Sequence, residues 1–439
     1  MKPIDQGTAT ERPERRPSVG WVKWLFVAFA AAAGGYFVFS WVRAHQGRNA
    51  FQSQVRALVD RAEFQEARDL IVGQWVATEP ESAEAQYFLG RSLLGLDRPQ
   101  EALVAFGKAL ELGYPQADLE RIIGIVLARS GRVTQAQSML EQDLARHPAP
   151  DAERDEAIAK IDADLYRFGS ALEAVERWAK AAPHAPEPYV LKAKLSNEMN
   201  AGSDLVADAY REALKRDPDL LSARLGLADA LRLQGSYSQA LTEYETVLKR
   251  QPSDAGTLAG AGLAALADGQ EDRAARYLDE AMKANPELSN AMDGRAAIAL
   301  RHREYAKALP WIDQALKIDP LNAELHYRRS LALDGLGRGE EALAEREATA
   351  RLRKEGVQLD DLRKKIMRAP RDVAIQAQLA RWLLSHGRAE EGLVWAERVM
   401  TTSGDSSEHR RDVAAELATY YEAQGNAGRA NYYRVIAGE

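Results

Sequence analysis

Imidazole and thiol side chains are the first place to look for chemistry, and this chain offers little of either. It contains seven histidines and no cysteine. Without cysteine there can be no disulfide, no thiolate metal site and no cysteine nucleophile. The histidines are scattered, with no pair at the spacing of metal ligands: His45, His147, His184, His302, His326, His386 and His409. We therefore expect no metal site and no cofactor.

The common catalytic motifs are missing as well. The sequence contains no GxxxxGK[ST], no HExxH and no GxSxG. Gly335, Gly337 and Gly339 resemble a glycine-rich loop, but no strand precedes them, so we interpret them as a turn between two helices. Carboxylates are abundant, yet an acidic helical surface brings pairs of them together by chance. We predict that the chain is not an enzyme.

Charge separates the N-terminal segment from the rest of the chain. Residues 1–50 contain seven Lys and Arg against three Asp and Glu, which leaves 51 basic against 62 acidic residues in 51–439. Such an acidic body repels a phosphate backbone, so we expect no nucleic acid partner. One basic cluster interrupts it: Arg351, Arg353, Lys354, Arg363, Lys364, Lys365 and Arg368. It could dock an acidic partner or anionic lipid, or it could be a solvated helix face.

An apolar element precedes the acidic body. Nineteen uncharged residues run from Trp24 to Val42, and tryptophans stand at both ends. At a rise of about 1.5 Å per residue this run spans roughly 28 Å, close to the thickness of a bilayer core. We predict a transmembrane helix over 21–42, after a disordered tail over 1–20 and before a linker over 43–50. No small-x-small cleavage site follows, which favours an uncleaved anchor over a signal peptide.

The flanking charges bear on orientation. Five basic residues precede the span and four follow it, and the densest group is N-terminal. This bias favours a bacterial inner-membrane protein whose body faces the periplasm. Ala30 with Gly34, and Ala31 with Gly35, could let two anchors pack into a homodimer, although small residues are also simply tolerated in membrane helices.

Prolines and glycines recur along the acidic body. Pro80, Pro115, Pro148, Pro183, Pro218, Pro252, Pro286 and Pro320 are separated by 35, 33, 35, 35, 34, 34 and 34 residues. Six glycines each stand five residues before a small residue, where a helix must turn back through a left-handed conformation. They are Gly131, Gly235, Gly269, Gly337, Gly387 and Gly425. The spacing predicts one pair of antiparallel helices per period.

Small and aromatic residues keep the same register. One period contains Leu89-Gly90, Ala102, Phe106 and Ala109; later periods contain Leu227-Ala228, Ala240 and Tyr244, then Gly262, Ala274, Leu278 and Ala281, then Ala296, Ala308 and Ala315. With a period near 34, this pattern resembles the tetratricopeptide repeat family. The resemblance implies an all-α, right-handed solenoid of helix pairs over most of 51–439.

The pattern has two departures. Trp178 and Val206 stand where small residues are expected. The gap from Pro320 to Pro370 is 50 residues, and the surplus falls in 354–369. We expect an array of about nine helix pairs over 51–353, an extra charged helix or a break over 354–369, and two further pairs over 370–439.

The resemblance also implies a binding groove. In this family the first helix of each pair lines a concave groove that holds peptides or partner proteins. Carried over by register, the candidate residues are Lys194, Asn197, Leu225, Asp229, Arg232, Ala259, Leu263, Leu266, Asp293, Arg301, Tyr327 and Leu331. Ala259, Leu263 and Leu266 would form an apolar floor for a helix or an extended segment, or would be ordinary packing if the register is off by one.

These expectations favour a membrane-anchored scaffold that binds other proteins and helps to assemble or regulate an envelope complex. Two alternatives stay open. One is an accessory protein of exopolysaccharide synthesis or export that binds glycan or its synthase, although Tyr327 is nearly the only groove aromatic. The other is an adaptor facing the cytoplasm. The sequence does not identify the partner.

Overall fold

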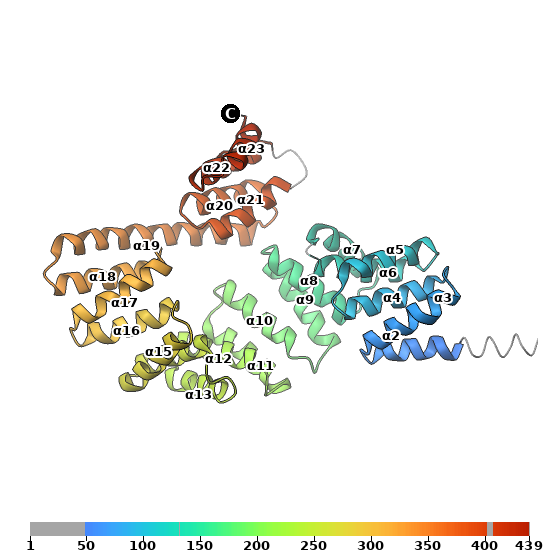
Figure 1. The fold of residues 1–439 in the computed structure, drawn as a ribbon, viewed down its shortest axis with the longest axis horizontal. Helices are drawn as coiled ribbons and strands as arrows, with labels where there is room; N and C mark the ends of the chain where they lie inside the picture. Colours follow the sequence, from blue (N-terminus) through green and yellow to red (C-terminus); the bar gives the residue numbers. More distant parts are fainter. Residues whose placement is uncertain (1–48, 131, 402–406, 439) are drawn as a thin grey trace, which may run out of the picture. The chain divides into compact units, whose positions relative to one another are not determined.

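The computed structural model describes residues 49–130, 132–401 and 407–438, and within these ranges every regular element is a helix (Figure 1). The chain divides into two compact units, Met1–Arg132 (unit 1) and Val133–Glu439 (unit 2). No feature of the sequence predicted this division. The all-helical solenoid expected from the repeats is confirmed for the described residues.

Unit 1 begins with a helix over 49–60. The helices that follow are α2 (Phe64–Leu70), a π-helical turn η1 (Ile71–Trp75), α3 (Val76–Thr78), α4 (Ala83–Gly95), α5 (Pro99–Glu111) and α6 (Gln116–Arg129). Its core is aromatic at both ends: Trp75 packs between Phe51 and Phe88, with each ring centroid 6.1 Å away, and Phe106 is fully buried beneath Gly90.

Unit 2 is a longer run of hairpins. Its helices are α7 (Val133–Arg146), α8 (Ala152–Asp164), α9 (Phe168–Ala181), α10 (Glu187–Glu198), α11 (Ser203–Arg216), α12 (Leu221–Leu233), α13 (Tyr237–Leu248), α14 (Ala255–Ala267), α15 (Glu271–Ala284), α16 (Ser289–Arg301), α17 (Tyr305–Ile318), α18 (Ala323–Gly335), α19 (Gly339–Arg368), α20 (Val373–Ser385), α21 (Ala389–Thr401), α22 (Ser407–Ala423) and α23 (Ala427–Ala437). The recurrent prolines lie in the links between hairpins, because proline cannot continue a helix.

The turn inside each hairpin needs one left-handed residue. The predicted glycines supply it in five hairpins, with φ of +84°, +82°, +76°, +74° and +71° at Gly235, Gly269, Gly337, Gly387 and Gly425. Gly131 lies outside the described residues. Five other turns place a side chain in the same conformation: Ala62, Asp97, Tyr166, Asn200 and Arg303.

This difference gives a stability prediction. Gly235→Ala forces a Cβ into the left-handed region and should lower the free energy of unfolding by about 1–2 kcal/mol. Arg303→Gly relieves the same strain but loosens the unfolded chain, so its effect should stay within about 0.5 kcal/mol. Urea unfolding of both variants checks this. Equal losses from the two exchanges would contradict it.

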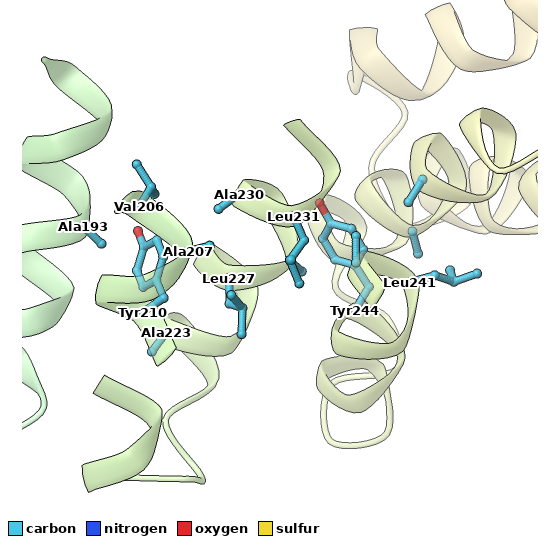
Figure 2. Packing of buried hydrophobic residues seen from close by; sticks show 14 of the residues in the cluster. Ala193, Val206, Ala207, Tyr210, Ala223, Leu227, Ala230, Leu231, Leu241 and Tyr244 are labelled. Carbon is cyan, nitrogen blue, oxygen red and sulfur yellow. The ribbon is translucent and has the colours of Figure 1, made fainter. Parts of the chain in front are cut away.

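Small residues let neighbouring helices approach closely (Figure 2). The alanines Ala207, Ala223, Ala240 and Ala274 are completely buried in the central core of unit 2. A Cβ on Gly260 of α14 would lie 2.7 Å from the Tyr244 ring of α13, and one on Gly262 would lie 2.7 Å from Leu278 Cγ of α15. Trp178 and Val206, the predicted irregularities, are both buried. These larger side chains therefore pack inside the core, and their helices α9 and α11 form as in the other hairpins.

The surplus residues after Pro320 lengthen one helix. Residues 354–368 continue the helix that starts at Gly339, so α19 is a single helix of 30 residues with Leu352, Leu359, Leu362 and Ile366 buried along one side. They therefore do not form a separate helix. α20–α23 then form the two last hairpins.

The predicted membrane anchor, 21–42, lies outside the described residues. Among the helices that are described, none is long and apolar enough to cross a membrane.

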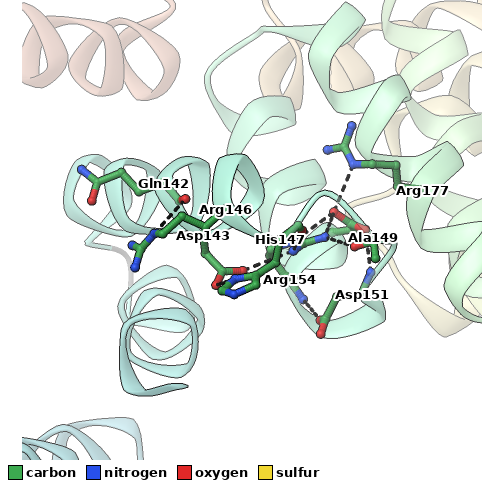
Figure 3. Close-up of polar contacts among 9 residues, drawn as sticks. Gln142, Asp143, Arg146, His147, Ala149, Asp151, Arg154 and Arg177 are labelled. Atoms are coloured by element: carbon green, nitrogen blue, oxygen red, sulfur yellow. Dashed lines mark hydrogen bonds and ion pairs between the residues drawn. The ribbon is translucent and has the colours of Figure 1, made fainter. Parts of the chain in front are cut away.

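A buried ion network joins α7 to α8 and α9 (Figure 3). The Arg154 guanidinium is 1% exposed and donates to Asp143 Oδ2 at 3.2 Å, to the carbonyl of His147 at 2.7 Å and to the carbonyl of Ala149 at 2.7 Å. Asp155, fully buried, accepts from Arg177 Nε at 3.1 Å and from the backbone N–H of Asp151 at 3.0 Å. Arg154 thus gives hydrogen-bond donors to the carbonyls of His147 and Ala149 in the loop 147–151, which would otherwise be unpaired.

Candidate functional site

A cavity of about 440 Å³ lies between α10, α11 and α12. Four of the predicted groove residues line it: Lys194, Asn197, Asp229 and Arg232. Lys194 and Asp229 each stand six residues before the left-handed turn residue of their hairpin, and Asn197 and Arg232 each stand three before it. The repeat therefore brings equivalent positions of two successive first helices to one cavity.

The rest of the cavity wall is partly apolar. Val206 and Tyr210 come from α11, and Leu233, 64% exposed, stands at the end of α12. Tyr210 lies directly against Gly226, where any larger residue would collide with its ring. Glu198 and Ala230 complete the lining. The site offers an apolar wall with charged groups of both signs.

A tyrosine from the core reaches this surface. Tyr244 of α13 is completely buried, and its hydroxyl donates to Asp229 while accepting from Arg232 Nε at 3.4 Å. Burial raises the pKa of Tyr244 far above its usual value, with the Asp229 charge acting in the same direction, so the hydroxyl stays protonated and remains a donor. The buried Tyr244 thus holds Asp229 and Arg232 in position at the edge of the cavity.

Two residues of the predicted apolar floor are not available as surface. Ala259 is 0% exposed and Leu266 is 7% exposed, each packed within the array. Their helix, α14, is apolar on all sides because neighbouring helices cover it, so groove and core could not be told apart by composition. Leu263 and Leu225 are half-buried against the same clusters. The apolar floor in its predicted form is therefore corrected to packing.

The remaining candidates lie further along the array. Asp293 pairs with Arg328 at 2.5 Å, and burial raises the pKa of its carboxyl while Arg328 opposes the shift. Arg301 donates to Glu271 at 3.2 Å. Tyr327 is 38% exposed beneath Arg353, whose guanidinium lies 5.5 Å from the ring centroid, and Leu331 is 39% exposed. None of these four lines the α10–α12 cavity.

The predicted basic cluster lies along α19 and is largely paired with acids. Arg363 bonds to Glu391 at 2.9 Å and Lys365 to Asp361 at 2.8 Å. Arg353 and Arg351 lie 3.7 Å and 3.8 Å from Glu324 and Glu355. This pattern supports a solvated, ion-paired helix face rather than a free anion surface.

A second cavity, of about 640 Å³, lies between α19, α20 and α22. Its lining includes Trp382, whose ring stacks on His386 with centroids 4.1 Å apart, together with Val357, Gln358, Arg381 and Glu416. No group of three or more His, Asp or Glu able to hold a metal occurs in the part of the chain that the structure describes.

Stacked helix pairs with small residues at their contacts define a helical-repeat protein. Residues 53–118, 207–255, 230–291 and 259–323 match the model of the tetratricopeptide repeat. The matched segments together span 183 of the 439 residues, and over them the chain is similar to tetratricopeptide repeats. Repeats of this kind typically serve as interaction scaffolds without catalytic activity.

Solved structures with this fold are similar but distant. YrrB, described as a tetratricopeptide repeat protein with an unusual peptide-binding site, is 17% identical; the match covers 44% of this chain and 97% of YrrB, with a TM-score of 0.40. PilF of Pseudomonas aeruginosa is 19% identical over 50% of this chain and 98% of its own, with a TM-score of 0.43. A tetratricopeptide repeat protein of Parabacteroides merdae is 16% identical over 57% and 98%, with a TM-score of 0.41. No curated protein sequence matches the chain.

Sequence reasoning missed several residues of the site. Tyr244 was recognised as a core aromatic, but its link to Asp229 and Arg232 was not predicted. The signal was its chemistry: a tyrosine at a buried position brings a hydroxyl that needs a partner, where phenylalanine would not. Glu198 and Leu233, one position beyond the predicted columns, were also missed.

Proposed function

We propose that this chain is a non-enzymatic scaffold, anchored in a bacterial inner membrane, that binds a segment of another protein in the α10–α12 cavity and helps to assemble or regulate an envelope complex. The observation that carries the binding part is the convergence of Lys194, Asn197, Asp229 and Arg232 around one cavity with an apolar wall. A space of about 440 Å³ is in the range of ligand-binding pockets and can hold side chains of a docked segment.

The side chains that line the cavity indicate what kind of segment would fit it. Leu233 and the Val206–Tyr210 wall favour an apolar anchor side chain. Lys194 has no ion pair among the described residues, and its side chain is exposed at the edge of the cavity. A carboxylate next to the anchor would complement it. We therefore expect the bound segment to carry an apolar residue close to an acidic one.

The site can be tested by cross-linking. With a photo-reactive amino acid at Leu233, the full chain in isolated membranes should give one discrete adduct. Lys194→Glu should reduce its yield about tenfold, because like charges repel at the rim. Glu280→Lys, an equally exposed charge reversal on α15, should leave the yield unchanged. An adduct that both variants preserve, or no adduct, would contradict binding at this cavity.

The membrane part of the proposal rests on the apolar run from Trp24 to Val42 and its flanking charges. Reporter fusions at the C-terminus that are active only in the periplasm should be active here. Activity of a cytoplasmic reporter alone would instead make the protein an adaptor on the inner face of the membrane.

A further inference from the structure

The α8–α9 and α20–α21 hairpins of unit 2 contact each other although a long stretch of sequence separates them. Tyr166, at the turn between α8 and α9, packs against Trp395 of α21, with ring centroids 4.9 Å apart. Arg398, one helical turn further on, donates to the carbonyl of Asp164 and lies 4.7 Å over the Trp395 ring. Tyr166 is the residue through which the α8–α9 turn joins the core of the C-terminal hairpins.

The backbone at this contact is strained. Tyr166 has a φ of +59°, the left-handed conformation that five other hairpin turns give to glycine. Holding a bulky residue there costs about 1–2 kcal/mol, and such strain persists only where the side chain is held by its surroundings. Here the Tyr166 ring joins the α8–α9 turn to Trp395 of α21. Four other hairpins make the same turn with Ala62, Asp97, Asn200 or Arg303, so it is the Tyr166 ring, and not the turn conformation, that is particular to this contact.

The same contact reaches the proposed binding site. A cavity of about 230 Å³ separates Asn197, Glu198 and Asn200 from the opposing side chains of α19. Asn197 and Glu198 line this cavity and the α10–α12 cavity alike. The α19 side is formed by Asp360, Arg363, Lys364 and Met367. A space of this size falls below the range of ordinary ligand pockets, so a polypeptide segment cannot continue past the end of α10 while α19 stays in place.

The interface that holds α19–α21 in place is polar at its edges. Beyond the aromatic pair and Arg398, an ion pair of 3.8 Å joins Arg371 to Glu141. Parts of a chain joined by such polar contacts are expected to move relative to each other. Small rotations between stacked helical repeats supply the motion without breaking any hairpin.

We propose that the Tyr166–Trp395–Arg398 contact is a clasp, which closes the C-terminal hairpins over the end of α10 and must open before the binding site takes its full partner segment. This inference rests on the proposed function for its consequence. Opening and closing of the clasp can be measured without any partner. The clasp and the proposed binding function can therefore be disproved separately.

The absence of cysteine makes the first test clean. Cysteines introduced at Ser170 and Ala374, exposed positions beside the contact, carry spin labels in the full chain. Pulsed electron resonance should show one short distance. Tyr166→Gly removes the ring but suits the left-handed turn, so the hairpin stays folded and the distance should lengthen. Arg303→Gly, the same exchange at an equivalent turn, should leave it short. A Tyr166→Gly chain that keeps the short distance overturns the clasp.

The second test measures access to the site. A single cysteine at Asn197, an exposed position that α19 faces across the smaller cavity, is labelled with a polymer-linked maleimide, whose bulk makes its reaction slow while α19 is close. Tyr166→Gly should raise the labelling rate roughly threefold to tenfold, the range expected from losing one aromatic pair. A cysteine at Ser238, exposed on α13, should react equally fast in both backgrounds. Unchanged labelling at Asn197 would overturn the gating of the site.

Discussion

Replacing Arg154 by methionine is expected to lower the free energy of unfolding of unit 2 by about 3–5 kcal/mol, because it leaves buried charge without a partner. The guanidinium serves Asp143 and two loop carbonyls at once, from a position that is 1% exposed. Methionine fills the volume but satisfies none of these groups. Arg154→Lys should recover less than half of the loss, since an ammonium cannot reproduce the planar fork.

Urea unfolding measures the loss, and hydrogen exchange localises it to α7–α9. The matched control is Arg211→Met, which breaks an ion pair to Asp208 that is 43% and 67% exposed and should cost no more than about 0.5 kcal/mol. Similar losses for the two variants would mean that burial of the Arg154 network contributes nothing of its own.

Tyr244→Ala is expected to cost about 3–5 kcal/mol, the range for emptying a fully buried aromatic site. The ring lies between α13 and Gly260 of α14, which has no side chain to fill the space. Tyr244→Phe keeps the ring and should cost about 1 kcal/mol, because it loses only the hydroxyl's hydrogen bonds with Asp229 and Arg232, and both charged groups can be hydrated.

The pair of variants also separates packing from function. Tyr244→Phe frees Asp229 and Arg232 at the cavity rim, so it should change adduct yield at the binding site although the fold is nearly intact. Tyr432→Ala, at a ring 62% exposed on α23, should change the free energy of unfolding by less than about 0.5 kcal/mol. Calorimetry that found Phe and Ala equally damaging at 244 would contradict the assignment of the ring to the core.

The repeat itself was predictable because its signals are local. A left-handed turn residue such as Gly269 and a buried small residue such as Ala274 stand at a fixed separation, and the turn and helix contact follow from them. Positions counted from the turn then located Lys194 and Asp229 at one cavity. Whether they bind a partner stays a prediction.

Other features depend on contacts that no short window of sequence contains. Around Arg154 the chain resembles an ordinary charged helix start, and nothing local shows that its charges are buried. Tyr166 meets Trp395 across more than two hundred residues. In α14, Ala259 and Leu266 looked like surface only because the covering helices come from other repeats. Long-range packing decided each case.

The continuity of α19 has a mechanical meaning. Thirty residues without a break form a rod about 45 Å long. Its length sets the distance between the α18–α19 turn and the hairpins α20–α23 that follow. A partner that contacted residues at both ends of α19 would therefore have to span that length.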